Sequence, residues 1–275
     1  MSDFEQVALT IEKEYIKNLL ASERRLDGRT KSEFREIKIE TGIIGTAQGS
    51  SIVSIGKTKV ICGVKAQIGT PYPDSPNKGS LTVGFEASPL SAPEHRSGPP
   101  QDHAIEIARV TDRLIRESEC VDLESLCLIE GEKIRTLIID IYSLDDFGNL
   151  IDACGIAALA ALATTQLPDV QVENGEIITL DTLSPLKLKS FPISITSYKI
   201  GDFYINDADL REELISDARI TFGTTETHIV SGQKGGQSGI KSNHILEILK
   251  DTIRASASIR EEIKKQIPTL KIFTN

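Results

Sequence analysis

The feature that most constrains the fold of this 275-residue chain is a stretch of small apolar side chains over residues 149–165. This stretch is rich in alanine, and Asp152 is its only charged residue. A helix that is apolar on every side has no face to present to water, so it must lie inside the fold. The preceding residues 134–144 (IRTLIIDIYSL) predict a buried strand. We therefore expect a buried helix that packs closely on a β-sheet.

The rest of the chain shows two successive sets of strands, each followed by a helix. In the first half, the residue patterns predict strands at 37–41, 52–55, 60–64 and 81–87, and a helix at 103–118 that Asp102 caps. In the second half, they predict strands near 193–199, 202–206, 218–222 and 227–232, a glycine-rich loop at 232–239 and a helix at 241–265. This order predicts an α+β fold with two similar halves, in which the sheets pack on helices.

The same patterns divide the chain into four parts. We expect an N-terminal helix and arm over 1–30, a first domain over 31–167, a proline-containing linker over 168–192 and a second domain over 193–275. The N-terminal helix, over 4–20, has an apolar stripe that another surface must cover. The stripe consists of Phe4, Val7, Ala8, Ile11, Tyr15 and Leu19.

Charge and cysteine usage limit the class of protein. The chain has 31 Lys and Arg against 40 Asp and Glu, a net charge of −9, so phosphate is repelled from most of its surface. No apolar run approaches the ~18 residues of a membrane span, and the first residues lack the pattern of a secretory signal. Four cysteines without CxxC spacing predict reduced thiols in a cytoplasmic protein. The absence of Trp and the abundance of Lys, Glu and Ile favour a heat-adapted organism.

Two motifs suggest ligand sites but fit simpler explanations. The glycine-rich loop misses the GxxxxGK spacing of a phosphate loop, because Ile240 separates Gly239 from Lys241. Its backbone could still hold an anion, although a strand-to-helix turn explains it as well. An acidic cluster could bind a metal or cap the next helix, and we expect the capping role and no metal site. Its members are Asp140, Asp145, Asp146 and Asp152.

The helix at 103–118 has the most informative surface. At 100° per residue, Glu106, Arg109, Arg113 and Arg116 fall on one face. Such a row can be a solvated face of ion pairs, with Glu106 bound to Arg109 and Asp112 to Arg116. It can also bind phosphates bidentately, as guanidinium groups do in RNA-binding proteins. Arg96, in the preceding proline-rich loop, could extend a phosphate-binding row.

Several motifs in order resemble a known family. These are the segments RLDGR at 25–29, GSSIVSIGKTKV at 49–60, RLIRES at 113–118 and DIYSLDDFGNL at 140–150. Together they resemble the RNase PH family of phosphorolytic 3′→5′ exoribonucleases, which includes the ring subunits of exosomes. The resemblance covers roughly residues 10–265, and it is strongest to the non-catalytic ring subunits of the archaeal exosome. It implies duplicated βαβα halves of the ribosomal protein S5 domain 2-like type.

The sequence departs from the pattern of active members where phosphate and the catalytic acids would be. The resemblance implies a Gly-Thr/Ser-Arg run that cradles inorganic phosphate, but Asn149 and Leu150 follow Gly148 here. Leucine cannot replace a guanidinium, so the phosphate site is expected to be lost. Of the DLxYxED pattern, Asp207 is kept, the tyrosine is replaced by leucine, and Glu213 stands for the second acid. The arginine pair expected before the first-domain helix is also missing, because residues 100–102 are PQD.

The resemblance therefore implies a subunit that supports RNA degradation without catalysing it. Asp207 and Glu213 would be vestigial, and the chain would use no cofactor or metal of its own. A catalytic RNase PH-like paralogue would supply the active site and use inorganic phosphate, within a hexameric ring of three heterodimers that also binds RNA-binding cap subunits. Single-stranded RNA would meet Arg96, Arg109, Arg113 and Arg116. The alternatives are an active phosphate-dependent exoribonuclease, a small-molecule kinase and a scaffold without RNA contact.

Overall fold

The first sheet carries the strand patterns of the first half of the chain. The computed structural model describes residues 3–96, 98–173 and 175–267. The sheet order is β1 (Ile37–Thr41), β2 (Gly49–Ile55), β3 (Thr58–Gly69), β6 (Lys133–Asp145) and β4 (Ser80–Glu86), with β5 (Cys127–Ile129) also on β6. A short 3-10 turn at Glu124–Leu126 precedes β5. All pairs are antiparallel except β4 with β6.

The second sheet is antiparallel and extends further along the chain than the sequence predicts. Its order is β10 (Phe203–Asn206), β9 (Ile193–Ile200), β11 (Ala218–Thr224) and β12 (Ile229–Gly236). The predicted loop at 232–239 is therefore wrong over residues 232–236, which continue β12. Glycine is needed at the end of this strand because Gly236 has a φ of 79°, and a Cβ there would lie 2.7 Å from the Cα of Ala218.

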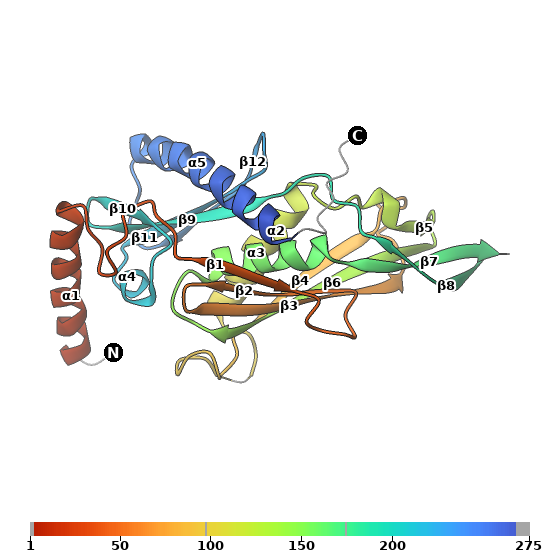
Figure 1. Cartoon of the computed structure of the whole chain (residues 1–275), viewed down its shortest axis with the longest axis horizontal. Helices are drawn as coiled ribbons and strands as arrows, with labels where there is room; N and C mark the ends of the chain where they lie inside the picture. The colour runs from red at the N-terminus through yellow and green to blue at the C-terminus, as the bar shows by residue number, and fades with distance from the viewer. Residues whose placement is uncertain (1–2, 97, 174, 268–275) are drawn as a thin grey trace.

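The apolar helix α3 (Leu150–Ala163) lies at the centre, as its composition predicts. Every residue from Leu150 to Leu162 is buried, and the helix packs on β2 and β3 of one sheet and on β9 of the other. Figure 1 shows it between the two sheets, with α2 (Asp102–Glu117) and α5 (Ser242–Gln266) alongside. A Cβ at Gly49 would overlap the carbonyl oxygen of Ala161, so β2 and α3 need small residues where they meet. Within the described residues, no helix is long and apolar enough to cross a membrane.

The N-terminal helix α1 (Asp3–Ala21) stands at one end of the molecule, beside α4 (Leu210–Leu214) (Figure 1). Its buried residues are Ile16 and Leu20, which join a small core with Tyr198 of β9. The predicted stripe is wrong for Val7, Ile11 and Tyr15, which are each more than half exposed, and the side chain of Phe4 is outside the described part. The reason is that α1 contacts this core through a different face, on which Leu9, Ile16 and Leu20 lie.

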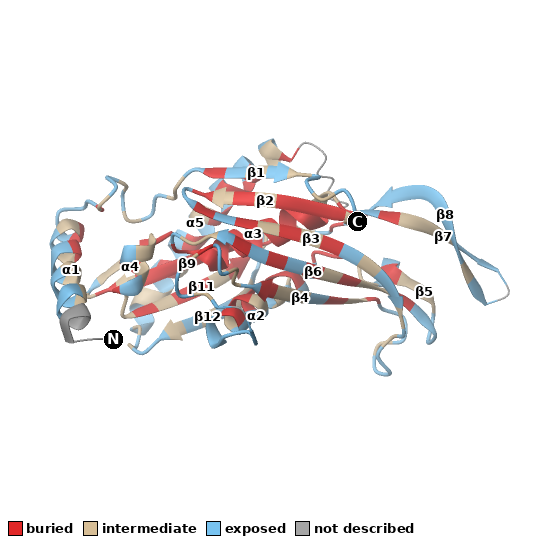
Figure 2. Cartoon of the chain, turned by 90° about the horizontal axis from the view of Figure 1, so that it is seen from below, coloured by how far each residue is buried: buried red, intermediate tan, exposed pale blue. Residues whose placement is uncertain are grey.

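The stretch between the two halves is more ordered than the sequence predicts. We expect a linker over 168–192, but strands β7 (Gln166–Glu173) and β8 (Glu176–Pro185) pair there as an antiparallel hairpin. The prolines are compatible with this hairpin because Pro168 lies beside a register shift and Pro185 ends β8. Figures 1 and 2 show the hairpin projecting away from the body of the molecule.

Candidate functional site

Two predicted features meet at the turn between β6 and α3. Gly148 and Asn149 both have positive φ angles, of 86° and 60°, so the chain reverses sharply before the helix begins. The Asn149 amide nitrogen Nδ2 donates to Asp207 Oδ1 and to Asp152 Oδ2, each at 2.9 Å. The Asn149 backbone N–H donates to Glu213 Oε2 at 2.8 Å. The structure thus brings the predicted vestigial acids, Asp207 and Glu213, to the position where the phosphate site is predicted to be lost.

Asp207 is buried and holds the N-terminal arm against the second half of the chain. Its Oδ2 accepts from Arg29 Nη1, from Arg35 Nε and from the Arg35 backbone N–H, all within 2.9 Å. Arg35 Nη2 also donates to Asp207 Oδ1 at 2.6 Å. Burial by itself raises the pKa of the Asp207 carboxyl, but the hydrogen bonds and charge of Arg35, with the Asn149 amide, hold it below its usual value. Asp207 is therefore an ionised structural anchor.

A second buried pair reinforces this anchor. The guanidinium of Arg25 binds both carboxylate oxygens of Glu212 and donates to the carbonyls of Asn206 and Asp207. Glu212 also accepts from the backbone N–H of Asp209, whose side chain caps α4 in return. The RLDGR motif at 25–29 therefore supplies arginines that fix the arm, whereas the sequence motifs do not single out Arg35. An arginine a few residues beyond that motif was the only available signal.

The start of α3 is occupied by a carboxylate of the chain itself. Helix N-termini attract anions, and Glu213 fills that position by accepting the Asn149 N–H. Burial raises the pKa of Glu213, and the hydrogen bond from Asn149 lowers it in part. Leu150, where active members are expected to have arginine, is only 3% exposed and belongs to the core. An incoming phosphate would meet a carboxylate and an apolar side chain here, both of which disfavour it.

Asp152 lies behind this turn and is held by hydrogen bonds within the fold. Its carboxylate accepts from the backbone N–H and the hydroxyl of Thr196, each at 2.9 Å, and from Asn149. Burial raises its pKa to about 7, against the opposing effect of these hydrogen bonds. The acidic cluster predicted with it does not converge: Asp140 is exposed on the sheet, and the described residues contain no group of metal-ligating side chains.

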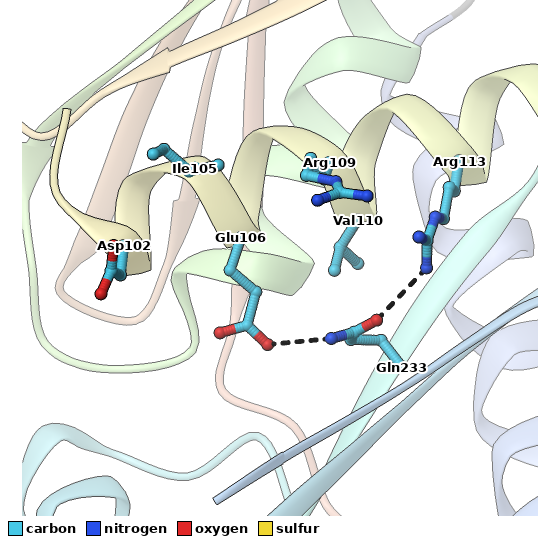
Figure 3. A pocket seen from close by; sticks show the side chains of 7 residues that line it. All are labelled: Asp102, Ile105, Glu106, Arg109, Val110, Arg113 and Gln233. Atoms are coloured by element: carbon cyan, nitrogen blue, oxygen red, sulfur yellow. Dashed lines mark hydrogen bonds between the residues drawn. The ribbon is translucent and has the colours of Figure 1, made fainter.

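The arginines of α2 form a second candidate site. Arg109 and Arg113 line a cavity of about 290 Å³ with Glu106 and with Gln233 of β12 (Figure 3). Gln233 donates to Glu106 Oε1 and accepts from Arg113 Nη1, each at 3.3 Å. Both arginines also line a neighbouring cavity with Arg116, so the three form one continuous face. Among the described residues, Arg109 has no hydrogen-bond or ion-pair partner.

Several details of this face differ from the sequence prediction. Glu106 does not pair with Arg109 but with Arg219, at 2.6 Å, because β11 brings that arginine beneath the helix. Arg116 pairs with Asp112, as predicted, and also donates to the Leu81 carbonyl at 2.8 Å. Asp102 does not cap α2: it is the first helical residue, and the N-cap is Gln101, without a side-chain hydrogen bond.

Arg96 lies apart from the other predicted RNA-binding residues. It lines a separate cavity of about 290 Å³ with His95, His103, Pro99 and Pro100. His95 is tied there to Ser91 through a 2.8 Å hydrogen bond. The sequence therefore predicts that Arg96 precedes α2, but it does not show that Arg96 lines a different cavity from Arg109 and Arg113.

Comparisons with known proteins agree with this geometry. The profile of the 3′ exoribonuclease family matches over its domain 1 at residues 33–168 and its domain 2 at residues 190–253. The chain is 44% identical over 264 residues to an "Exosome complex component Rrp42" of Thermococcus gammatolerans, covering 95% of this chain and 96% of the relative. A protein of the same description from Methanopyrus kandleri is 42% identical over 88% of this chain and 90% of its own length.

Solved structures give the same result. A chain from "archaeoglobus fulgidus exosome with RNA bound to the active site" superposes with a TM-score of 0.87 at 38% identity, covering 94% of this chain and 100% of that one. A chain of "Archaeal exosome core" gives 0.83 at 36% identity, covering 94% and 99%. The α+β fold expected from the sequence is confirmed as RNase PH-like. The chain belongs to the 3′ exoribonuclease family, the RNase PH family.

Proposed function

We propose that the chain is a non-catalytic subunit of an exosome core ring that degrades RNA from its 3′ end by phosphorolysis. Its relatives are described as exosome components, and its solved structural neighbours come from archaeal exosomes. The observation that carries the non-catalytic role is the start of α3. There Glu213 accepts the Asn149 N–H, and Leu150 is buried where a cation would be needed.

The chemistry of phosphorolysis explains why this observation matters. The attacking phosphate and the scissile phosphodiester both carry negative charge, which cationic groups must offset in the transition state. Asp207 cannot serve there as an acid, because Arg29 and Arg35 hold it as an ionised, buried anchor. The presence of Asp207 and Glu213 would favour the alternative of an active phosphate-dependent exoribonuclease. Because Asp207 is held in this way, that alternative has less support than the non-catalytic role.

The contribution of the chain would be RNA binding and organisation of its partner. A catalytic RNase PH-like paralogue would alternate with it in a hexameric ring of three heterodimers and would use the inorganic phosphate. RNA-binding cap subunits would bind this ring, which would work in the cytoplasm. Arg109 and Arg113 are the best candidates for the RNA contact, since neither is held by a carboxylate of the described residues. Arg116 is partly neutralised by Asp112, and Arg96 lies in a separate cavity, so we expect weaker contributions from both.

Charge reversal in the assembled ring tests the RNA contact. The variant Arg109→Glu/Arg113→Glu should lower the affinity of the ring for single-stranded RNA by about tenfold or more and reduce its salt dependence. The matched control, Lys250→Glu/Arg254→Glu, reverses two exposed charges on α5 and should leave the affinity unchanged. Equal affinities for the two double variants would show that the chain is a scaffold without RNA contact.

A further inference from the structure

The β7–β8 hairpin is exposed over most of its length: nine of the ten residues of β8 are exposed. It projects from the end of the first sheet (Figures 1 and 2), and its strands pair with each other from Gln166↔Pro185 to Glu173↔Glu176. Among the described residues, the backbone hydrogen bonds of 170–173 and 176–183 run only between these two strands. Both outer edges of the hairpin are therefore open.

Apolar side chains cover both faces of this ribbon. The exposed fractions are 46% for Val172, 43% for Ile178, 38% for Leu180 and 59% for Leu183. Successive residues of a strand point to opposite faces, so Ile177 and Ile178 lie on opposite sides. An isolated two-stranded hairpin is at best marginally stable in water, and exposed apolar ribbons promote association. The exposed apolar side chains of the hairpin are therefore suited to a contact surface for another protein.

The charge of the hairpin restricts what can cover it. Residues 166–185 contain four carboxylates and neither Lys nor Arg nor His. Arg135 stands at the base of the hairpin, where it donates to the Pro168 carbonyl and lies near Asp169. Farther out, Glu173, Glu176 and Asp181 have no cationic partner among the described residues. RNA would be repelled here, and so would the same hairpin of a second copy.

We infer that the β7–β8 hairpin docks on the neighbouring RNase PH-like paralogue of the ring, at an apolar surface bordered by lysine or arginine. This inference rests on the proposed function. A permanently exposed apolar ribbon suits a permanent partner, because obligate interfaces are more apolar than transient ones. The carboxylates fix the sign of the partner's charge, and the open strand edges can add main-chain hydrogen bonds.

Two variants with a control test the docking. Glu176→Lys/Asp181→Lys reverses the charge, and Ile178→Ser/Leu180→Ser removes apolar side chains that are already exposed, so neither should unfold the body of the protein. Each should weaken binding to the purified paralogue by about tenfold or more. The control Glu247→Lys/Asp251→Lys reverses two exposed carboxylates of α5 and should bind like the unaltered chain. Circular dichroism checks that all variants fold.

Hydrogen exchange locates the contact. Amides of 170–173 and 176–183 should exchange more slowly once the paralogue is added to the unaltered chain, and RNA alone should not protect them. If the ring assembles but these amides exchange as in the free chain and both variants bind normally, the docking inference is wrong and the proposed function stands. Protection in the chain alone that grows with its concentration would assign the hairpin to a second copy and overturn the inference. If the chain does not bind the paralogue at all, the proposed function itself fails.

Discussion

At the scale of single residues, Asn149 lies at the centre of a hydrogen-bond network at the turn before α3. Its amide joins Asp207 and Asp152, and its backbone N–H joins Glu213. Three carboxylates from two segments of the chain, Asp152 in α3 and Asp207 and Glu213 around α4, therefore meet at one turn. Arg35 supplies a compensating charge from a third segment. Where active relatives are expected to bind phosphate between cations, this chain has a network of internal hydrogen bonds.

This network predicts a large effect of Asp207 on stability. Asp207→Asn removes the charge that Arg29 and Arg35 share, and it should lower the free energy of unfolding by about 3 kcal/mol or more, because buried cations lose their partner. Chemical denaturation measures the change. Asp140→Asn, an exposed carboxylate, is the control and should change the same quantity by less than about 0.5 kcal/mol. Similar values for the two variants would contradict the anchoring role.

Asp152 predicts a pH dependence of stability. Its pKa is raised from 3.8 to about 7 by burial, so the folded chain holds this proton more tightly than the unfolded chain does. The stabilising contribution of the protonated form is complete below about pH 4 and is lost as the pH rises through about 7, up to about 4 kcal/mol in all. Asp152→Asn should remove this dependence, so the difference in unfolding free energy between variant and unaltered chain should grow in that window. A difference that is constant from pH 4 to 8 would contradict it.

The sequence could identify some residues of this site but not their hydrogen-bond and ion-pair partners. Asn149, Leu150, Asp207 and Glu213 stand out because they depart from, or keep, the motifs of active relatives. Nothing in the sequence pairs Arg35 with Asp207, since 172 residues separate them and only the fold brings them together. For the same reason the local rule that pairs Glu106 with Arg109 fails, and Arg219 takes that place from another strand.

At the scale of elements, the turn before α3 depends on Gly148. Its φ of 86° is costly for other residues, and a Cβ there would lie 2.6 Å from the backbone of Asp209 and Leu210. Gly148→Ala should therefore destabilise the protein by about 3 kcal/mol, the sum of strain and overpacking. Gly131 also has a positive φ but open space around it, so Gly131→Ala should cost only about 1 kcal/mol. Equal thermal midpoints for the two variants would show that contact with α4 does not matter.

Elements whose patterns extend over many residues could be predicted, and exceptions arise where tertiary contacts decide. The buried helix and the long strands follow from composition and alternation alone. The hairpin over 166–185 is not predicted because prolines at its base indicate a linker. Its strands are exposed, so no buried face gives them the pattern of a core strand. Strand β12 was hidden by glycines that accommodate Phe222 and Arg219 of its neighbour. The buried face of α1 is the one with Leu9, Ile16 and Leu20, and periodicity alone does not decide between this face and the predicted stripe.

At the scale of the whole molecule, charge and apolar surface are distributed unequally. The chain is acidic overall, but Arg109, Arg113 and Arg116 form one continuous face on α2, and apolar side chains remain exposed on α1 and the β7–β8 hairpin. A monomer gains nothing from such exposed apolar elements. In the proposed ring subunit they would serve as contacts, while the cationic face would meet RNA and the acidic surface would stay free of it.

The most direct test of this account is phosphorolysis by the chain alone and with its paralogue. Purified chain is mixed with labelled single-stranded RNA and inorganic phosphate, and the release of nucleoside diphosphates is measured with and without the RNase PH-like paralogue. We expect no release from the chain alone, and a higher rate with both subunits than with the paralogue alone. Nucleoside diphosphate release by the chain alone would contradict the non-catalytic role and the loss of the phosphate site at Asn149 and Leu150.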